Sequence, residues 1–145
     1  MKTLVELGGD SGFTLIEMVV VMLVIGILSA IAMPQFARVA EKPKAAEGVH
    51  LLLAVKGAQE RHFNRYGTYC IGALAGCLDI DLPNPLYFGA IPNTAVSGGS
   101  WKLTLSRIGA PYYYGAYTMT FDGNAGTLTC PGNARCQTDL VPANL

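Results

Sequence analysis

The sequence predicts an α+β protein in which a long N-terminal hydrophobic helix continues into a second half that packs on a small antiparallel β-sheet. Three patterns predict it. An uncharged apolar run extends from Met18 to Met33, apolar residues recur at three- and four-residue steps from 35 to 67, and alternating apolar and polar residues follow Trp101. The 145 residues allow one domain of modest core beyond the first helix.

The composition excludes two classes of protein. Hydrophobic residues make up 51% of the chain and charged residues 14%, whereas soluble domains carry about 25% charged residues. This apolar content excludes an intrinsically disordered chain. Ten basic residues balance ten acidic ones, so no overall basic surplus favours an electrostatic nucleic-acid binder.

The apolar run is long enough to cross a membrane. Phe13 to Met33 contains 21 residues, which as a helix at about 1.5 Å per residue span about 31 Å. A secretory signal peptide is one alternative, because residues 30–32 (Ala-Ile-Ala) resemble a cleavage site. Its apolar region normally has about 7–15 residues, however, and this run is longer. A simple membrane anchor fits the length but leaves Glu17 unexplained.

Glu17 is the unusual residue of this run. A carboxylate at the bilayer centre costs about 2.5–3.5 kcal/mol on insertion scales and marks a functional candidate, although near the end of the run it could also reach the headgroups. The preceding residues favour function. Cleavage after Gly12 would create an α-amino group at Phe13, four residues before Glu17 and largely cationic at neutral pH. Such a pair would set the register between packed helices.

These residues resemble the type IV pilins and their pseudopilin relatives. The resemblance rests on Gly12 followed by Phe13-Thr14-Leu15-Ile16-Glu17, on the long apolar helix and on Pro34. It implies that a prepilin peptidase, a membrane aspartyl protease with methyltransferase activity, removes the leader 1–12 after Gly12 and N-methylates Phe13. It also implies that Glu17 pairs with the amine of a neighbouring subunit during assembly. The leader departs from the usual basic pattern, since it carries Lys2 against Glu6 and Asp10.

The resemblance also implies a location, partners and a use. The precursor would lie in the bacterial inner membrane, and the mature chain would form a homo-oligomeric extracellular pilus filament used for adhesion, motility or DNA uptake. A cytoplasmic assembly ATPase and a membrane platform protein would drive assembly. The alternative is a pseudopilin of a type II secretion system acting in protein export. A third alternative is a membrane-anchored binding domain that never polymerises.

Two residues are expected to weaken the first helix. Gly26 lowers local helix preference, and Pro34 cannot donate its amide to the carbonyl near Ala30. A passive kink is one interpretation. In the resembling filaments, the stretch between such a glycine and proline loses helical order, which predicts the same for 26–34 here. The apolar run and the resemblance together predict a transmembrane and filament-core helix over 13–34.

The remaining chain is expected to form a head. An amphipathic helix over 35–67 should end near Gly67, and its apolar positions are Val49, Leu52, Leu53 and Phe63. A β-sheet head over 68–145 should contain a meander whose apolar face lies on that helix. The expected strand positions are Trp101, Leu103 and Leu105, then Tyr113, Tyr117, Met119 and Phe121, then 127–130, with turns at 109–111 and 122–126.

Four cysteines favour disulfides. The spacings of Cys70, Cys77, Cys130 and Cys136 do not match zinc knuckles, and an even number beyond a membrane segment is typical of a head outside the cytoplasm. Three connectivities are possible. Short separation favours Cys70 with Cys77 and Cys130 with Cys136. A disulfide-closed C-terminal loop also resembles pilins.

No enzymatic activity, cofactor or metal is expected. No nucleophile elbow or phosphate-binding loop occurs, and His50 and His62 lie about 120° apart on the helix, so a shared metal is not expected. Residues 79–81 (Asp-Ile-Asp) favour a solvated turn over a calcium loop. The tyrosines at 112–114 favour packing and surface roles over a ligand site.

Overall fold

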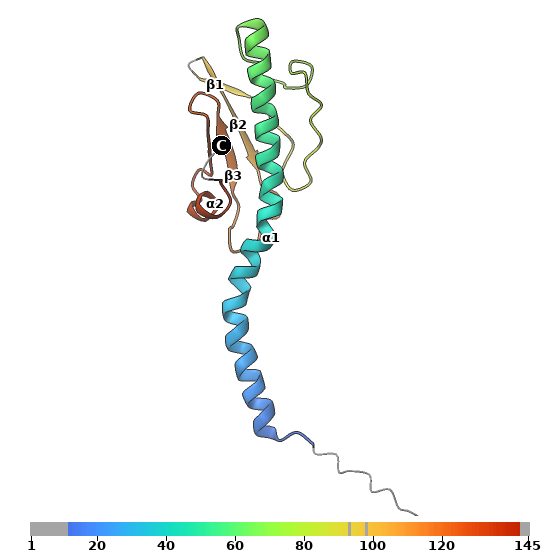
Figure 1. Cartoon of the computed structure of the whole chain (residues 1–145), viewed down its shortest axis with the longest axis vertical. Helices are drawn as coiled ribbons and strands as arrows, with labels where there is room; N and C mark the ends of the chain where they lie inside the picture. The colour runs from blue at the N-terminus through green and yellow to red at the C-terminus, as the bar shows by residue number, and fades with distance from the viewer. Residues whose placement is uncertain (1–11, 93, 98, 143–145) are drawn as a thin grey trace, which may run out of the picture. The chain divides into compact units, whose positions relative to one another are not determined.

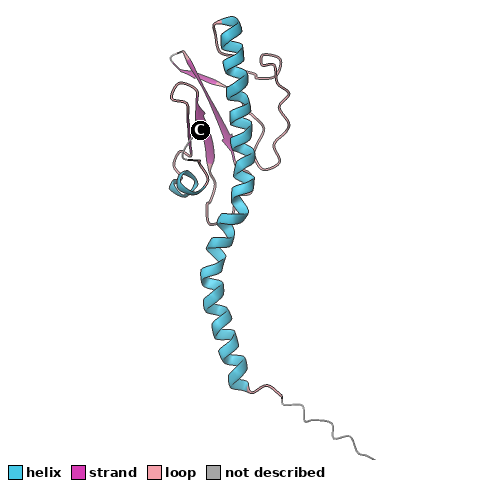
Figure 2. Ribbon diagram, in the orientation of Figure 1, coloured by secondary structure: helices cyan, strands magenta, loops and turns pink. Residues whose placement is uncertain are grey.

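The computed structural model describes residues 12–92, 94–97 and 99–142, and it confirms the predicted α+β class. Figures 1 and 2 show the elements along the chain. The chain divides between Gln35 and Phe36 into two compact units. The elements are α1 (Leu15–Tyr66), β1 (Ala95–Ser97), β2 (Ser100–Ser106), β3 (Thr118–Asp122), β4 (Thr127–Thr129) and α2 (Ala134–Asp139). Neither β1 nor α2 is expected from the sequence pattern.

Helix α1 ends where the sequence predicts. Gly67 adopts the left-handed conformation with φ of 73°, and its N–H donates to the Phe63 carbonyl at 2.8 Å. This arrangement stops the helix and satisfies a terminal carbonyl. The helix continues without interruption through Gly26 and Pro34. A loss of helical order between these two residues therefore remains a prediction for the assembled filament.

The sheet is an antiparallel meander with strand order β1-β2-β3-β4. Leu103 pairs with Phe121 and Leu105 with Met119, and Phe121 pairs on its other side with Leu128. Along β2 the side chains alternate between buried and exposed, as the sequence predicts. The prediction that Tyr113 shares a strand with Met119 is wrong. Tyr113 lies in a turn before β3, which the Tyr114 N–H closes by donating to the Pro111 carbonyl at 3.0 Å.

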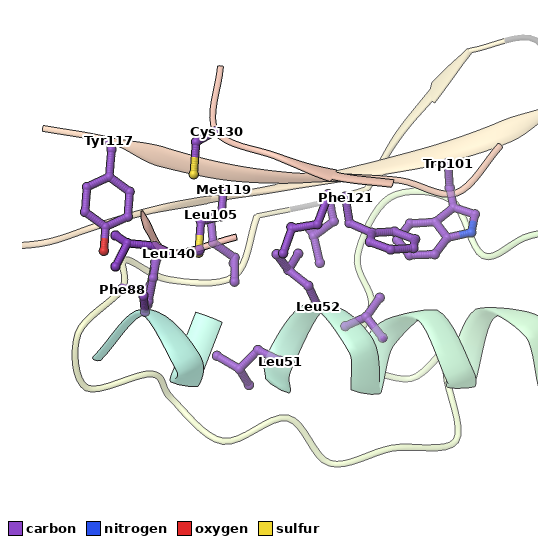
Figure 3. Close-up of a cluster of buried hydrophobic side chains, with 14 of the residues drawn as sticks. Leu51, Leu52, Phe88, Trp101, Leu105, Tyr117, Met119, Phe121, Cys130 and Leu140 are labelled. Atoms are coloured by element: carbon purple, nitrogen blue, oxygen red, sulfur yellow. The ribbon is translucent and has the colours of Figure 1, made fainter. Parts of the chain in front are cut away.

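The core lies between the second half of α1 and one face of the sheet (Figure 3). Leu52 and Val55 of α1 are completely buried, and so are Leu105 and Met119 of the sheet. The predicted helix face is only partly correct. Val49 and Leu53 are half-buried because they lie to one side of the buried stripe formed by Ala45, Gly48, Leu51, Leu52, Val55 and Ala58. Phe63 lies near the helix end and is 42% exposed, although its ring stacks on that of Tyr69.

A buried ion pair also joins α1 to the sheet. The Nε atom of Arg107 donates to Oε1 of Glu41 at 2.6 Å, and the Tyr117 hydroxyl donates to the same oxygen at 2.9 Å. Arg107 donates further to the carbonyls of Tyr87 and Ile108. Burial lowers the pKa of Arg107, but the hydrogen bond and charge of Glu41 outweigh that effect and raise it above its usual value. The network ties the helix to the end of β2 with its polar atoms satisfied.

Two glycines of α1 make a matched test of core packing. A Cβ atom at Gly48 would lie 2.5 Å from Cζ of buried Phe88, whereas one at Gly57 meets nothing closer than the Arg61 Nη1 atom at 3.6 Å. We expect Gly48→Ala to lower the free energy of unfolding by about 1–3 kcal/mol through overpacking. Gly57→Ala should raise it by about 0.5–1 kcal/mol through helix propensity. Denaturant unfolding of the full chain in detergent, followed by Trp101 fluorescence, measures both. Equal stabilisation by both variants would contradict the packing.

The ion pair gives a second test of stability. Arg107→Met leaves Glu41 buried without its cation and should cost about 3–5 kcal/mol. Replacing the network together, as Glu41→Leu, Arg107→Met and Tyr117→Phe, should recover most of that loss, because no buried charge remains. Arg38→Met is the control. Arg38 pairs with Asp139 at 3.2 Å with 43% of its side chain exposed, and its loss should cost less than about 1 kcal/mol. A control variant as unstable as Arg107→Met would contradict this difference.

Candidate functional site

The bond between Gly12 and Phe13 lies in exposed, non-helical chain just before α1. Phe13 is 80% exposed, and a Cβ atom at Gly12 would meet nothing within 4 Å. The first helical residue is Leu15. A peptidase could therefore reach this bond without unwinding the helix.

Thr14 and Glu17 form a reciprocal cap at the start of α1. The Thr14 N–H donates to Oε2 of Glu17 at 2.8 Å, and the Thr14 hydroxyl donates to the same oxygen at 2.7 Å. The Glu17 N–H lies 3.3 Å from the Thr14 hydroxyl oxygen. This is a capping box, in which two side chains satisfy the free donors of the first helical turn. The cap was not predicted from the sequence, although a threonine three residues before a glutamate is its local signal.

The cap occupies only half of the Glu17 carboxylate. Both Thr14 bonds end on Oε2, and within the described part of the chain Oε1 accepts no hydrogen bond. Cleavage after Gly12 would place an ammonium group next to Thr14, at the positive end of the helix dipole. A cation there is unfavourable unless a carboxylate compensates it. Thr14 thus holds one oxygen of Glu17, and the other oxygen accepts no hydrogen bond within the described residues.

The first half of α1, which follows this cap, is apolar on all sides. Among the described helices, α1 alone is long and apolar enough to cross a membrane, with a mean hydropathy of 2.7 in its most apolar window, and none of that window is buried. Leu15 is 81% exposed and Met33 is 71% exposed. A helix that is hydrophobic around its whole circumference requires lipid or other helices around it.

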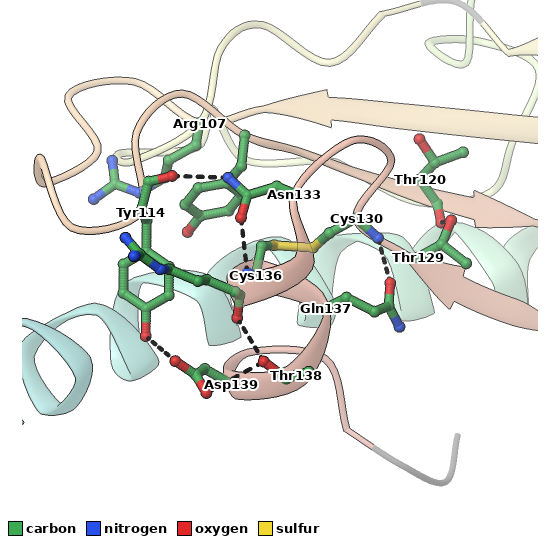
Figure 4. The surroundings of a disulfide bond; sticks show 12 residues. Arg107, Tyr114, Thr120, Thr129, Cys130, Asn133, Cys136, Gln137, Thr138 and Asp139 are labelled. Atoms are coloured by element: carbon green, nitrogen blue, oxygen red, sulfur yellow. Dashed lines mark hydrogen bonds between the residues drawn. A yellow bond between two sulfur atoms is a disulfide. The ribbon is translucent and has the colours of Figure 1, made fainter.

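Two disulfides close loops of the head. They join Cys70 to Cys77 and Cys130 to Cys136, the pairings that short sequence separation favours. Figure 4 shows how side chains hold the second loop. The Asn133 side chain caps α2 by accepting from the Cys136 N–H at 3.0 Å, and the Gln137 side chain accepts from the Cys130 N–H at 2.7 Å. The loop therefore has a defined conformation beyond its covalent link.

The three consecutive tyrosines have different environments. Tyr114 is buried, and its hydroxyl donates to Asp139 at 3.3 Å. Tyr113 is half-buried, and the guanidinium groups of Arg38 and Arg135 lie 5.5 Å and 4.6 Å from its ring centre. Tyr112 is fully exposed. The three side chains therefore occupy packing and surface positions, as the sequence predicts.

The acidic residues after the first disulfide loop are partly engaged. Both carboxylate oxygens of Asp79 accept from Arg61, at 2.9 Å and 2.7 Å. This hydrogen-bonded pair lowers the pKa of Asp79. In the described residues, no three His, Cys, Asp or Glu side chains gather closely enough to hold a metal ion.

Comparisons with known proteins place the N-terminal segment in a recognised class. Residues 9–33 match the family described as the prokaryotic N-terminal methylation motif. This range includes Gly12, Phe13 and Glu17. The chain therefore carries the methylation motif of prokaryotic pilins.

Two relatives make the class more specific. The type IV major pilin protein PilA of Myxococcus xanthus (strain DK1622) is 36% identical over 100 residues, covering 52% of this chain and 45% of that protein. The fimbrial protein EcpC of Eikenella corrodens is 25% identical over 129 residues, covering 86% of this chain and 84% of that protein. No solved structure gives a significant match. The chain is thus similar to a type IV major pilin over about half of its length and to a fimbrial protein over most of it, in agreement with the resemblance that its sequence shows.

The buried phenol beside the C-terminal loop predicts a pH dependence. Burial and the negative charge of Asp139 raise the pKa of Tyr114 to about 12. Because this pKa lies above the ordinary value of 10.0, the neutral phenol contributes stability that is complete below pH 10 and is lost as the pH rises through about 12. Wild type should therefore lose more stability than Tyr114→Phe across this range, as measured by denaturant unfolding with circular dichroism. Tyr112→Phe is the exposed control and should follow wild type. Coincident curves for Tyr114→Phe and wild type would contradict the role of the buried phenol.

Proposed function

We propose that this chain is the structural subunit of an extracellular type IV pilus. The methylation motif and the pilin relatives support the class. The half-occupied carboxylate of Glu17 at the head of an unburied apolar helix carries the proposal, because neither feature is satisfied within one chain. Both are satisfied when several copies pack side by side.

Processing would prepare the subunit for assembly. Prepilin peptidase would cut after Gly12, remove residues 1–12 and leave Phe13 as an N-methylated terminus. The accessible bond supports this step. The methylated amine stays cationic, and its position next to Thr14 places it beside the helix cap.

Assembly would then join the amine of one subunit to Glu17 of another. Thr14 holds Oε2, and Oε1 accepts no hydrogen bond within the described residues, so it would be open to a new donor. In an apolar filament core such a pair must form, since an unpaired ion costs several kcal/mol. The pair would set the axial register of neighbouring helices over 13–34, while the domains formed by 35–67 and 68–145 cover the filament surface.

The energy for assembly would come from outside the subunit. Apolar side chains gain little by leaving lipid for equally apolar helices, so hydrophobic burial alone does not extract the precursor from the inner membrane. An assembly ATPase acting through a platform protein would supply that work.

The finished filament would serve adhesion, motility or DNA uptake. A pseudopilin of a type II secretion system would share the processing and the Glu17 pairing but would form a short fibre for protein export.

Three replacements at Glu17 and Glu60 test the proposal in cells. Glu17→Gln preserves the capping side chain but removes the charge, because glutamine also serves in a capping box. Glu17→Val removes both. We expect each Glu17 variant to reduce the yield of sheared surface fibres at least about tenfold. A tenfold loss corresponds to about 1.4 kcal/mol, which is a modest share of the cost of an unpaired buried ion. Glu60→Val, at an exposed glutamate of the head, should assemble normally.

The fibres themselves supply the second measurement. Mass spectrometry of sheared wild-type material should find N-methyl-Phe13 as the first residue. Wild-type fibre yield from Glu17→Gln would refute the ionic pairing, and normal behaviour of Glu17→Val would favour a membrane-anchored binding domain. Cell-surface pili observed by electron microscopy without overexpression would distinguish a pilus from a short secretion fibre.

A further inference from the structure

The two disulfides of the head differ in exposure. Cys130 and Cys136 are both buried, at 4% and 0% exposure, and Cys70 is 1% exposed. Cys77 is the exposed member of the four. An external thiol can therefore reach one sulfur of the first disulfide in the folded head, whereas the second disulfide offers no such access.

Cys77 opens into a basic cavity at the end of α1. The cavity has a volume of about 340 Å³, and its lining includes Arg61, His62, Arg65 and Tyr66. Arg61 is paired with Asp79, but the Arg65 guanidinium lies 5.4 Å from the Tyr66 ring centre and makes no ion pair within the described residues. The two arginines and one aspartate leave one net positive charge. The cavity therefore favours an anionic ligand.

His62 is aimed at the Cys77 sulfur. Its Nδ1 atom lies 2.8 Å from the Thr68 carbonyl, which can only accept, so Nδ1 carries the proton. The other ring nitrogen, Nε2, lies 3.7 Å from Sγ of Cys77. In the neutral ring Nε2 can take the proton of a Cys77 thiol. A nearby histidine and cationic arginines are the surroundings that favour a reactive thiolate.

Hydrogen bonds from Gln59 hold the Cys70 backbone in position, so that the disulfide can form again after reduction. The Gln59 side chain accepts from the Cys70 N–H at 2.8 Å and donates to the Cys70 carbonyl at 2.8 Å. These bonds fix the Cys70 backbone independently of the disulfide. The buried sulfur of Cys70 would therefore stay next to Cys77 after reduction.

We propose that Cys77 is a thiol–disulfide exchange site for small anionic thiols and disulfides of the glutathione class. During closure the Cys77 thiolate attacks one sulfur of oxidised glutathione, the glutathione S–S bond breaks, and one glutathione thiolate leaves and takes up a proton. The Cys70 thiolate then attacks Sγ of Cys77 and displaces the second glutathione. The two cysteines are oxidised to a disulfide, and one oxidised glutathione is reduced to two thiols. Reduction by glutathione runs through the same mixed disulfide in reverse.

The first experiment uses the wild-type full chain in detergent without denaturant. The protein is incubated with reduced glutathione, quenched with N-ethylmaleimide and mapped by peptide mass spectrometry. Cys70 and Cys77 should open at least about tenfold faster than Cys130 and Cys136, because attack requires access to sulfur. Equal opening of both disulfides, or no opening before unfolding, would overturn the proposal.

Single-cysteine replacements identify the sulfur that reacts first. Cys70→Ala leaves Cys77 free, and Cys77→Ala leaves Cys70 free. With oxidised glutathione, the mixed disulfide should form at least about tenfold faster on Cys77 than on Cys70. Equal rates would overturn the assignment to Cys77. The wild-type mapping remains decisive if either variant fails to fold.

The charge of the probe tests the ligand class. In the Cys70→Ala background, where Cys77 is a free thiol, Arg65→Gln should slow the reaction of Cys77 with oxidised glutathione by about two- to fivefold, the range expected for one exposed charge. It should not slow the reaction with cystamine, a cationic disulfide. Arg135→Gln, which lies beside Tyr113 and away from this cavity, is the control and should change neither rate. Equal slowing of both probes by Arg65→Gln would overturn the anionic class.

Discussion

A carboxylate in an apolar helix must find partners, and this requirement organises the N-terminal unit of the molecule. Glu17 meets half of it locally, because the Thr14 N–H and hydroxyl both donate to Oε2. The same contacts cap the helix, so the residue that needs a partner also fixes where α1 begins. Oε1 is left without a partner in the described chain. This division explains how one side chain can stabilise its own helix and still be available to another subunit.

Glu41, the glutamate that α1 buries, has the opposite arrangement. Glu41 is completely buried, and Arg107 and Tyr117 of the same chain bind its oxygens. Both carboxylate oxygens of Glu41 therefore have hydrogen-bond donors within the chain and need no further partner. The contrast separates two roles along one helix, since the satisfied carboxylate belongs to the fold and the half-satisfied one belongs to the proposed assembly. A buried pair of this kind is costly to break but adds little by itself to stability, so its effect is to hold the helix in one register on the sheet.

The sequence predicted those features that depend on local patterns. The apolar run, the end of the helix at Gly67, and strands β2, β3 and β4 follow from periodicity and turn chemistry. The buried face of the helix was only partly predicted, because the sheet decides which neighbouring positions are covered, and Val49 and Leu53 lie at the margin. The three-residue β4 was predicted from the turn at 122–126 that precedes it, whereas β1 and α2, with three and six residues, are too short to show a period and were missed. The Glu41 network joins residues 66 positions apart, which no local pattern reveals. The capping box was a local signal that was overlooked.

The continuous helix between Gly26 and Pro34 is compatible with its predicted loss of order in a filament. Pro34 cannot supply the amide bond to Ala30, and Gly26 is among the weakest helix formers. Residues 26–34 are all exposed, so in a single chain the helical backbone bonds alone maintain this stretch. Lipid cannot satisfy free peptide groups, which keeps the helix intact in the membrane. In a filament, polar groups of neighbouring chains could satisfy them instead. The same segment would then be helical in the precursor and extended in the fibre because its surroundings change, with no change in its sequence.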